Sequence, residues 1–109
     1  LVHAVKTADE LTYLNPIQKY QDEHPEQFQY IPFVSREQTS HAMPGRIPAA
    51  IEDSRLSKAT GLEITPEDSQ VMICGNLPMI KDTSEALNQL GLVKNRRSQP
   101  GHITTEKYF

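Results

Sequence analysis

Short apolar runs alternate along the chain with segments whose apolar positions have helical spacing. Residues 1–5, 28–34 and 71–75 form the apolar runs, and each is rich in residue types that favour strands. Apolar side chains in these runs occupy both faces, which is typical of strands buried on two sides. Strands of this kind that alternate with helices predict a mostly parallel sheet between two helical layers, a three-layer αβα fold.

Local signals predict where the helices begin and end. Residues 7–10 read T-x-x-E, a capping box, so a helix is expected over residues 8–24. Pro16 would kink or break it. In the second strand, Pro32 lacks a backbone donor, and this predicts a position at a sheet edge.

Two further helices are expected downstream. The first covers residues 46–56 and turns Ile47, Ala50 and Ile51 inward. A polar connector, residues 58–70, follows it. The last helix starts after Asn76, a good N-terminal cap, and ends at Gly91 in the C′ position.

Composition excludes several classes of protein. The chain has 109 residues, enough for one small domain, and its net charge of −3 argues against a dedicated nucleic-acid binder. Its apolar runs are far shorter than the roughly 18 residues of a membrane span. A single cysteine forms neither an intramolecular disulfide nor a multi-thiolate zinc site, and the histidines make no metal pattern with it. No metal is predicted, and a cytoplasmic location is the default.

The chain opens with an apolar run and has no initiator methionine. Natural domains rarely begin inside what looks like a buried strand. We therefore expect part of the domain, and a further domain, to lie upstream.

Polar side chains at the predicted strand ends are candidates for ligand binding, because ligands of parallel sheets bind beyond the carboxyl ends of the strands. Ser35 and Arg36 offer a hydroxyl and a guanidinium that together suit a phosphate. Arg46 lies at the start of the next predicted helix, where backbone N–H groups also favour anions. This set would suit NADP better than NAD. Ordinary surface arginines remain the alternative on local sequence alone.

The end of the third predicted strand offers different chemistry. Gly75 would let a ligand approach the backbone, and the small thiol of Cys74 can line a pocket. A buried core cysteine is the alternative. Nothing adjacent would activate Cys74 as a nucleophile. The aromatic side chains of Tyr108 and Phe109 need either the core or a planar cofactor to rest against.

Five segments occur in an order that resembles one family: "LVHAV", "FVSRE", "GRIPAAIE", "VMICGNLPMIKDT" and "RRSQPGHITTEKYF". The chain resembles the NADP-binding domain of bacterial ferredoxin/flavodoxin–NADP reductases over nearly its whole length, and the C-terminal segment is the most specific. The resemblance implies that residues 1–109 are a partial NADP(H)-binding domain. The family's N-terminal FAD-binding barrel and the first strand of its NADP domain, with a Gly-rich turn, would be absent.

The resemblance also implies roles for individual residues at the phosphates of NADP. Ser35 and Arg36 match the pair that contacts the 2′-phosphate, and Arg46 matches a second phosphate-binding arginine. Lys6 stands where relatives often have an arginine on the cofactor's phosphates; a lysine keeps the charge and loses the bidentate geometry.

A second group of residues matches the catalytic end of the family's cofactor site. Cys74 and Gly75 match the strand end beside the nicotinamide, and Asn76 and Met79 flank it. Tyr108 matches the aromatic that lies against the flavin ring. Phe109 matches a final aromatic near the FAD adenine. Cys74 and Tyr108 are therefore the catalytic candidates, with Cys74 as a wall of the pocket.

The activity implied is hydride transfer between NADPH and FAD, followed by one-electron exchange with a ferredoxin or flavodoxin. The 109 residues alone are expected to be inactive. In the family's strand order the missing strand lies between the strands that match residues 1–5 and 71–75. The unpaired edges left there are expected to allow dimerisation or exchange of elements between chains.

Other functions remain open. A reductase component of an oxygenase system would share the fold, and often prefers NADH and lacks the phosphate-binding arginines. A non-catalytic nucleotide-binding module would use its C-terminal aromatics to fill the core. A flavodoxin-like phosphate-binding domain needs a hydroxyl- and Gly-rich loop that residues 3–10 do not supply. The basic residues 94–97 could meet an acidic carrier protein, although a solvated turn is favoured.

Overall fold

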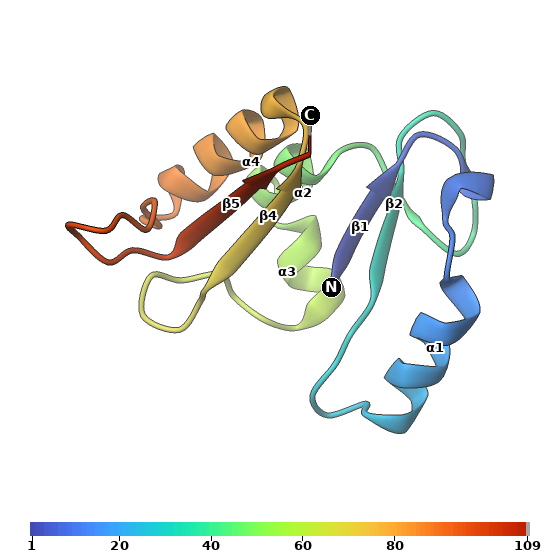
Figure 1. Ribbon diagram of the computed structural model, residues 1–109. Coiled ribbons are helices and arrows are strands. Elements are labelled where there is room, and N and C mark those ends of the chain that lie inside the picture. The colour runs from blue at the N-terminus through green and yellow to red at the C-terminus, as the bar shows by residue number, and fades with distance from the viewer. Residues whose placement is uncertain (109) are drawn as a thin grey trace. The chain divides into compact units, whose positions relative to one another are not determined.

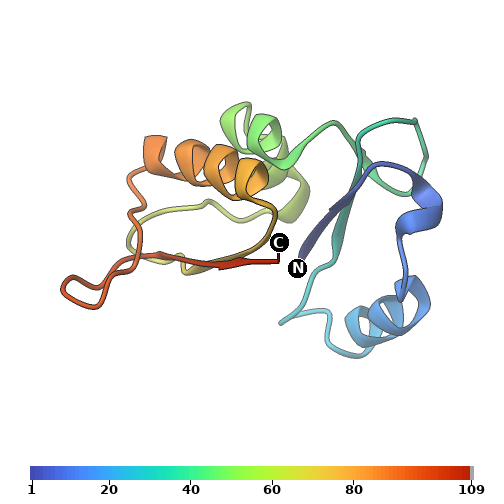
Figure 2. The same cartoon turned by 45° about the horizontal axis from the view of Figure 1, so that its top comes forward.

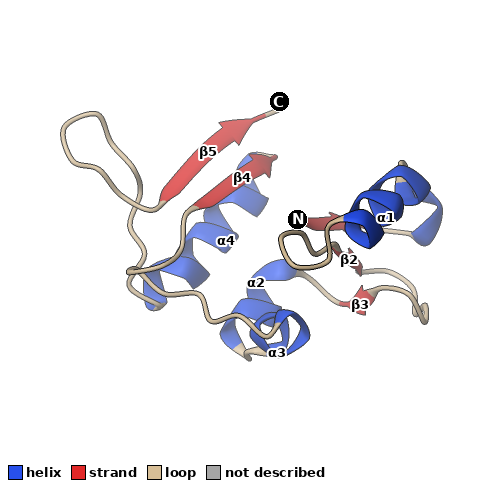
Figure 3. Cartoon of the chain, turned by 90° about the horizontal axis from the view of Figure 1, so that it is seen from below, coloured by secondary structure: helices blue, strands red, loops and turns tan. Residues whose placement is uncertain are grey.

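The computed structural model describes residues 1–108, which divide into two compact units. Unit 1 comprises Leu1–Ala50 and unit 2 comprises Ile51–Phe109, and each is described by itself. The α-helices and four of the strands are labelled in Figure 1, and β3 is labelled in Figure 3. In chain order they are β1 (Val2–Val5), the 3-10 helix η1 (Ala8–Glu10), α1 (Leu14–Glu23), β2 (Ile31–Val34), β3 (Met43–Pro44), α2 (Ile47–Glu52), α3 (Arg55–Thr60), β4 (Val71–Gly75), α4 (Leu77–Gln89) and β5 (Ile103–Lys107).

Unit 1 contains a three-stranded parallel sheet in the order β1-β2-β3. The register pairs Val5 of β1 with Val34 of β2, and Val34 with Pro44 of β3. Phe33 and Val34 are almost fully buried in the central strand β2. The prediction of parallel strands is confirmed, and the two-residue strand β3 was not predicted.

The prediction that Pro32 places its strand at a sheet edge is wrong. β2 pairs on both sides. The N–H groups of Ile31 and Ser35 donate to β1, to the carbonyls of Leu1 and Val5 at 2.9 and 3.1 Å. Because successive N–H groups of a strand alternate in direction, the nitrogen of Pro32 faces the β3 side. β3 begins only opposite Phe33, so no ladder bond is lost.

The first predicted helix starts later than its capping signal indicates. The Thr7 N–H donates to Glu10 Oε1 at 3.1 Å, as a capping box requires, but only one 3-10 turn follows. Tyr13 then adopts a left-handed conformation (φ 62°), and α1 begins at Leu14. Pro16 falls within the first turn of α1, where its missing N–H has no intrahelical partner to lose.

The second predicted helix is two short helices, α2 and α3. Ser54 (φ 67°) interrupts them in a left-handed conformation. The Asp53 carboxylate accepts from the Arg55 N–H at 3.0 Å and from Arg55 Nε at 2.8 Å, contacts that hold the pKa of Asp53 below its usual range. The connector predicted from residue 58 begins later, because α3 continues to Thr60 and ends at Gly61 (φ 71°).

The apolar positions predicted to face inward in this region are confirmed. Ile47, Ala50 and Ile51 are all buried. Ala50 and Ile51 come three and four residues after Ile47, the spacing that places side chains on one side of a helix.

Unit 2 is a β4-α4-β5 arrangement in which the two strands run parallel (Figure 3). α4 packs along both strands and buries Thr83, Ala86 and Leu87. The predicted ends of α4 are confirmed. Asn76 Oδ1 accepts from the Met79 N–H at 2.9 Å, and Gly91 follows the C-cap with φ 94°. β5 was not predicted; it follows the basic residues 94–97.

One face of the β4–β5 sheet carries exposed side chains. α4 lies along the other face (Figure 2), where Ile73 is buried. Met72 is 84% exposed, and Cys74 is also exposed. The prediction that this strand is buried on both sides is therefore wrong for unit 2, because the residues of the unit cover one face only.

Within residues 1–108, β1 and β4 each pair on one side only. The exchange of elements through such edges stays a prediction. No helix in that part of the chain is long and apolar enough to cross a membrane.

Candidate functional site

Basic side chains follow all three strands of unit 1 at the edge where the strands end. Lys6 comes directly after β1, Arg36 comes two residues after β2, and Arg46 comes two residues after β3. All three are exposed. Because the carboxyl ends of neighbouring parallel strands meet at one edge of a sheet, the topology gathers these cations there.

Backbone hydrogen bonds hold two of these turns together. The Ser35 N–H donates to the Val5 carbonyl at 3.1 Å, and the Arg36 N–H donates to the Lys6 carbonyl at 2.9 Å. The pairing of β1 and β2 thus continues past the end of the strands. It brings Lys6, Ser35 and Arg36 together, although only the topology of β3 relates Arg46 to them.

A side chain adds a third link between the same turns. Glu37 Oε1 accepts a hydrogen bond from the Ala8 N–H. Glu37 stands at the polar strand end of the segment "FVSRE", but no role was predicted for it, because the contact joins positions 29 apart in the sequence. The adjacent acidic residues Asp9 and Glu10 contact Thr7 instead, within their own turn.

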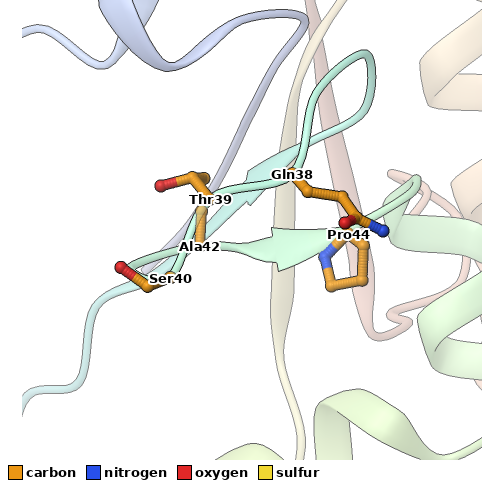
Figure 4. A pocket seen from close by; sticks show the side chains of 5 residues that line it. All are labelled: Gln38, Thr39, Ser40, Ala42 and Pro44. Atoms are coloured by element: carbon orange, nitrogen blue, oxygen red, sulfur yellow. The ribbon is translucent and has the colours of Figure 1, made fainter.

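The loop between β2 and β3 lines a cavity of about 370 Å³ (Figure 4). Its lining residues are Gln38, Thr39, Ser40, Ala42 and Pro44. Sequence reasoning identified this segment only as a polar loop. The size falls within the roughly 300–1,000 Å³ of small-molecule pockets. The sequence signal that could have indicated this pocket is the run of polar side chains that follows a parallel strand.

Among the described residues, the carboxyl end of the unit 2 sheet has no comparable cluster of charge. β4 ends in Cys74 and Gly75, and their partners in β5 are Glu106 and Lys107. The Tyr108 N–H donates to the Gly75 carbonyl at 3.0 Å, so the pairing continues one residue past β5. Tyr108 thereby follows the strand end that carries Cys74, and its side chain is 66% exposed.

The side chains of Cys74 and Tyr108 interact. Electrostatic repulsion from Cys74 and a hydrogen bond to its sulfur raise the pKa of Tyr108 above its usual range, with smaller effects from burial and from Glu106. Two alternatives are therefore wrong for the described structure. Cys74 is not a buried core cysteine, and Tyr108 does not fill the core.

Gly75 leaves room for the side chain of Met79. A Cβ at this position would lie 3.0 Å from Met79 Sδ, a contact tighter than side chains normally make. Met79 therefore packs over the backbone at the end of β4, while Asn76 is occupied in capping α4. All three were predicted to lie at a ligand site; the cap made by Asn76 was predicted as well, and the contact between Met79 and Gly75 was not.

Phe109, the remaining predicted site residue, lies outside the described residues. Residues 1–108 contain no cluster of three or more His, Cys, Asp or Glu side chains that could hold a metal ion.

The basic residues 94–97 lie in a hairpin that leads into β5. Arg96 and Gln99 exchange backbone hydrogen bonds of 3.0 and 3.1 Å, and the Asn95 side chain accepts from the Gly101 N–H at 2.9 Å. Lys94, Arg96 and Arg97 are exposed. These features fit an ordered, solvent-exposed turn.

Comparison with known proteins agrees with this fold. Residues 1–85 match the family described as "Oxidoreductase NAD-binding domain". The chain belongs to this family. The strand ends described above are therefore those of a NAD-binding domain, whose ligands bind at the carboxyl edge of the sheet.

Curated relatives are longer than this chain. The whole chain is 39% identical to the flavodoxin/ferredoxin–NADP reductase of Buchnera aphidicola subsp. Schizaphis graminum and covers 43% of it. It is 38% identical to the protein of the same name from Escherichia coli (strain K12) and covers 44% of that protein. The chain thus spans less than half the length of these relatives.

A solved structure matches the complete chain. It is a ferredoxin NADP+ reductase from Neisseria gonorrhoeae with bound FAD and NADP, and its TM-score is 0.91 at 30% identity, with 44% of that protein covered. A cytochrome P450 reductase from Amycolatopsis shares the fold, with a TM-score of 0.72 at 23% identity. The predicted α/β fold of a reductase NADP-binding domain is confirmed.

Proposed function

We propose that this NAD-binding domain is the NADP(H)-binding portion of a flavoprotein ferredoxin/flavodoxin–NADP reductase. The observation that carries the proposal is the group formed by Ser35 and Arg36 beside Lys6, with Arg46 after the next strand, at the carboxyl edge of unit 1. The fold and the relatives support the same class of enzyme.

The chemistry of unit 1 fits a phosphate dianion. Arg36 can donate two parallel N–H groups to one phosphate, Ser35 adds a hydroxyl donor, and Lys6 adds a mobile charge. Arg46 is the fourth contact in the proposal. A 2′-phosphate distinguishes NADP from NAD, so these side chains would set the preference for NADP.

Unit 2 fits a neutral, flat group. Cys74 would form a wall of the nicotinamide pocket, beside Gly75, Asn76 and Met79. Tyr108, largely exposed at the same strand end, would rest against the flavin ring. When bound, the cofactors would exchange a hydride between nicotinamide and FAD, and the flavin would then exchange single electrons with a ferredoxin or flavodoxin.

The bacterial relatives and the reducing nucleotide support a cytoplasmic location.

A reductase that serves an oxygenase is the second candidate, and the likeness to a cytochrome P450 reductase concerns the fold alone. Such reductases often use NADH. The cations at the edge of unit 1 favour the first candidate.

A calorimetric titration with 2′,5′-ADP and with 5′-AMP tests the proposal. We expect clear preference for 2′,5′-ADP, and a loss of about 10- to 100-fold in its affinity in Arg36→Ala, since a charge-assisted hydrogen bond contributes about 1.5–3 kcal/mol. Affinity for 5′-AMP should not change.

Arg97→Ala is the matched control, because it removes the same group from the exposed hairpin of unit 2. It should leave both affinities unchanged. A folded protein that binds the two nucleotides equally would contradict the proposal. We also expect the 109 residues produced alone to lack FAD; a yellow preparation that reduces an acceptor with NADPH would overturn that expectation.

A further inference from the structure

Glu37 joins the two turns that carry the proposed phosphate ligands. It belongs to the turn after β2, directly after Arg36, and its Oε1 accepts from the Ala8 N–H in the turn after β1. Ala8 lies two residues after Lys6. Of the contacts described between the two turns, this is the one made by a side chain; the others are the backbone bonds of Ser35 and Arg36.

We propose that Glu37 is a positioning residue for the 2′-phosphate site, which holds the Ser35–Arg36 turn against the Lys6 turn. The inference rests on the proposed function and names a residue that neither the sequence motifs nor the comparisons assign. It predicts that the acceptor oxygen of Glu37, and not its charge, supports phosphate binding.

The charge itself should oppose phosphate binding. A carboxylate next to Arg36 repels a phosphate dianion, and at an exposed position the repulsion is screened. In the proposal, the hydrogen bond of Glu37 to the Ala8 N–H offsets this repulsion. The other acidic side chains in these turns, Asp9 and Glu10, are engaged with Thr7 and cannot replace it without breaking those bonds.

Two variants separate the oxygen from the charge. Glu37→Gln keeps an acceptor oxygen of the same reach and removes the charge. Glu37→Ala removes both. Glu26→Ala is the control, since Glu26 is an exposed acid of unit 1 located before β2, at the opposite end of that strand. All are compared in the complete protein, with any flanking sequence retained.

The readout is the ratio of affinities for 2′,5′-ADP and 5′-AMP. We expect Glu37→Ala to lower the ratio about three- to tenfold, Glu37→Gln to keep or raise it, and Glu26→Ala to leave it unchanged. Equal ratios in all variants, or a rise in both Glu37 variants, would overturn the proposal. Thermal midpoints close to that of the parent protein show that a loss is not general unfolding.

Hydrogen exchange of the Ala8 amide gives an independent readout that needs no ligand. Exchange should be slow in the parent and in Glu37→Gln, and fast in Glu37→Ala. Fast exchange in the parent would overturn the positioning role, whatever the nucleotide preference. Slow exchange together with equal affinity for both nucleotides would instead contradict the proposed function. The two failures are thus distinguishable.

Discussion

The carboxyl edges of the two sheets are equivalent positions in parallel sheets, but their side chains differ: one edge is cationic and the other carries little net charge. In unit 1, three parallel strands end in exposed cations and a hydroxyl. In unit 2, two parallel strands end in a thiol, a glycine and an exposed tyrosine, and Glu106 and Lys107 offset each other's charge. The edge of a parallel sheet therefore dictates where a ligand binds and leaves open which ligand it is.

The two edges also differ in how they are built. In unit 1, bonds between turns hold the side chains, and Glu37 supplies one of those bonds. In unit 2, the end of β4 is fixed by the cap of α4 and by Met79 packed over Gly75. Substitutions at the unit 1 edge should accordingly change the affinity for nucleotides. Substitutions at the unit 2 edge should change local packing or the pKa of Tyr108.

The largest expected effect is a loss of stability in the sheet that carries the unit 1 edge. Phe33→Ala empties the fully buried side-chain position of the central strand and should lower the free energy of unfolding by about 3–5 kcal/mol. Ile31→Ala, in the same strand and only partly buried, is the control and should cost less. Denaturant unfolding measures both. Equal costs would argue against β2 as the centre of the core of unit 1.

A smaller effect is expected from a variant that separates charge from hydrogen-bond geometry at that edge. Arg36→Lys keeps the charge and loses the bidentate donor geometry, so affinity for 2′,5′-ADP should fall about tenfold. Lys6→Arg adds the geometry to a neighbouring cation and should not weaken binding. Calorimetry compares the two. Unchanged affinity in Arg36→Lys would mean that unit 1 attracts the phosphate by charge alone.

In unit 2, the hydroxyl of Thr83 is buried in α4 and has no hydrogen-bond partner among residues 1–108. Thr83→Val replaces it with a methyl group and should raise the free energy of unfolding by roughly 1 kcal/mol. Nucleotide preference should not change, because Thr83 lies in unit 2 and the cations belong to unit 1. A loss of stability would indicate that the hydroxyl has a partner in solution.

The smallest effect concerns the pair at the unit 2 edge. Removing the sulfur in Cys74→Ala should lower the pKa of Tyr108 toward its usual value, since the thiol raises it. Because the pKa of Tyr108 in the folded protein lies above that of the unfolded chain, its contribution to stability is complete below about pH 10 and falls as pH rises through the folded-state pKa. NMR of labelled tyrosine follows the titration. Tyr30, whose pKa burial raises, is the internal control and should not move.

Much of the candidate site could be predicted because its residues lie at or just after strand ends. Ser35, Arg36 and Cys74 were identified from that position, Lys6 was assigned through the family resemblance, and the roles of all four stay predictions. The role proposed for Glu37 and the pocket lined by residues within 38–44 were not predicted. The role of Glu37 depends on its contact with Ala8, and the pocket depends on the path of residues 38–44; no local pattern encodes either.

Local sequence patterns predict the alternation of strands and helices, the capping of α4 by Asn76 and Gly91, and the inward positions of α2. These features depend on interactions within a few residues, so they appear in the local pattern. Three other features follow only from the folded chain: Pro32 lies in a central strand, β5 pairs with β4, and Cys74 and Met72 share an exposed face. Pairing and burial are set by residues distant in the chain, and the sequence pattern near each residue does not record them.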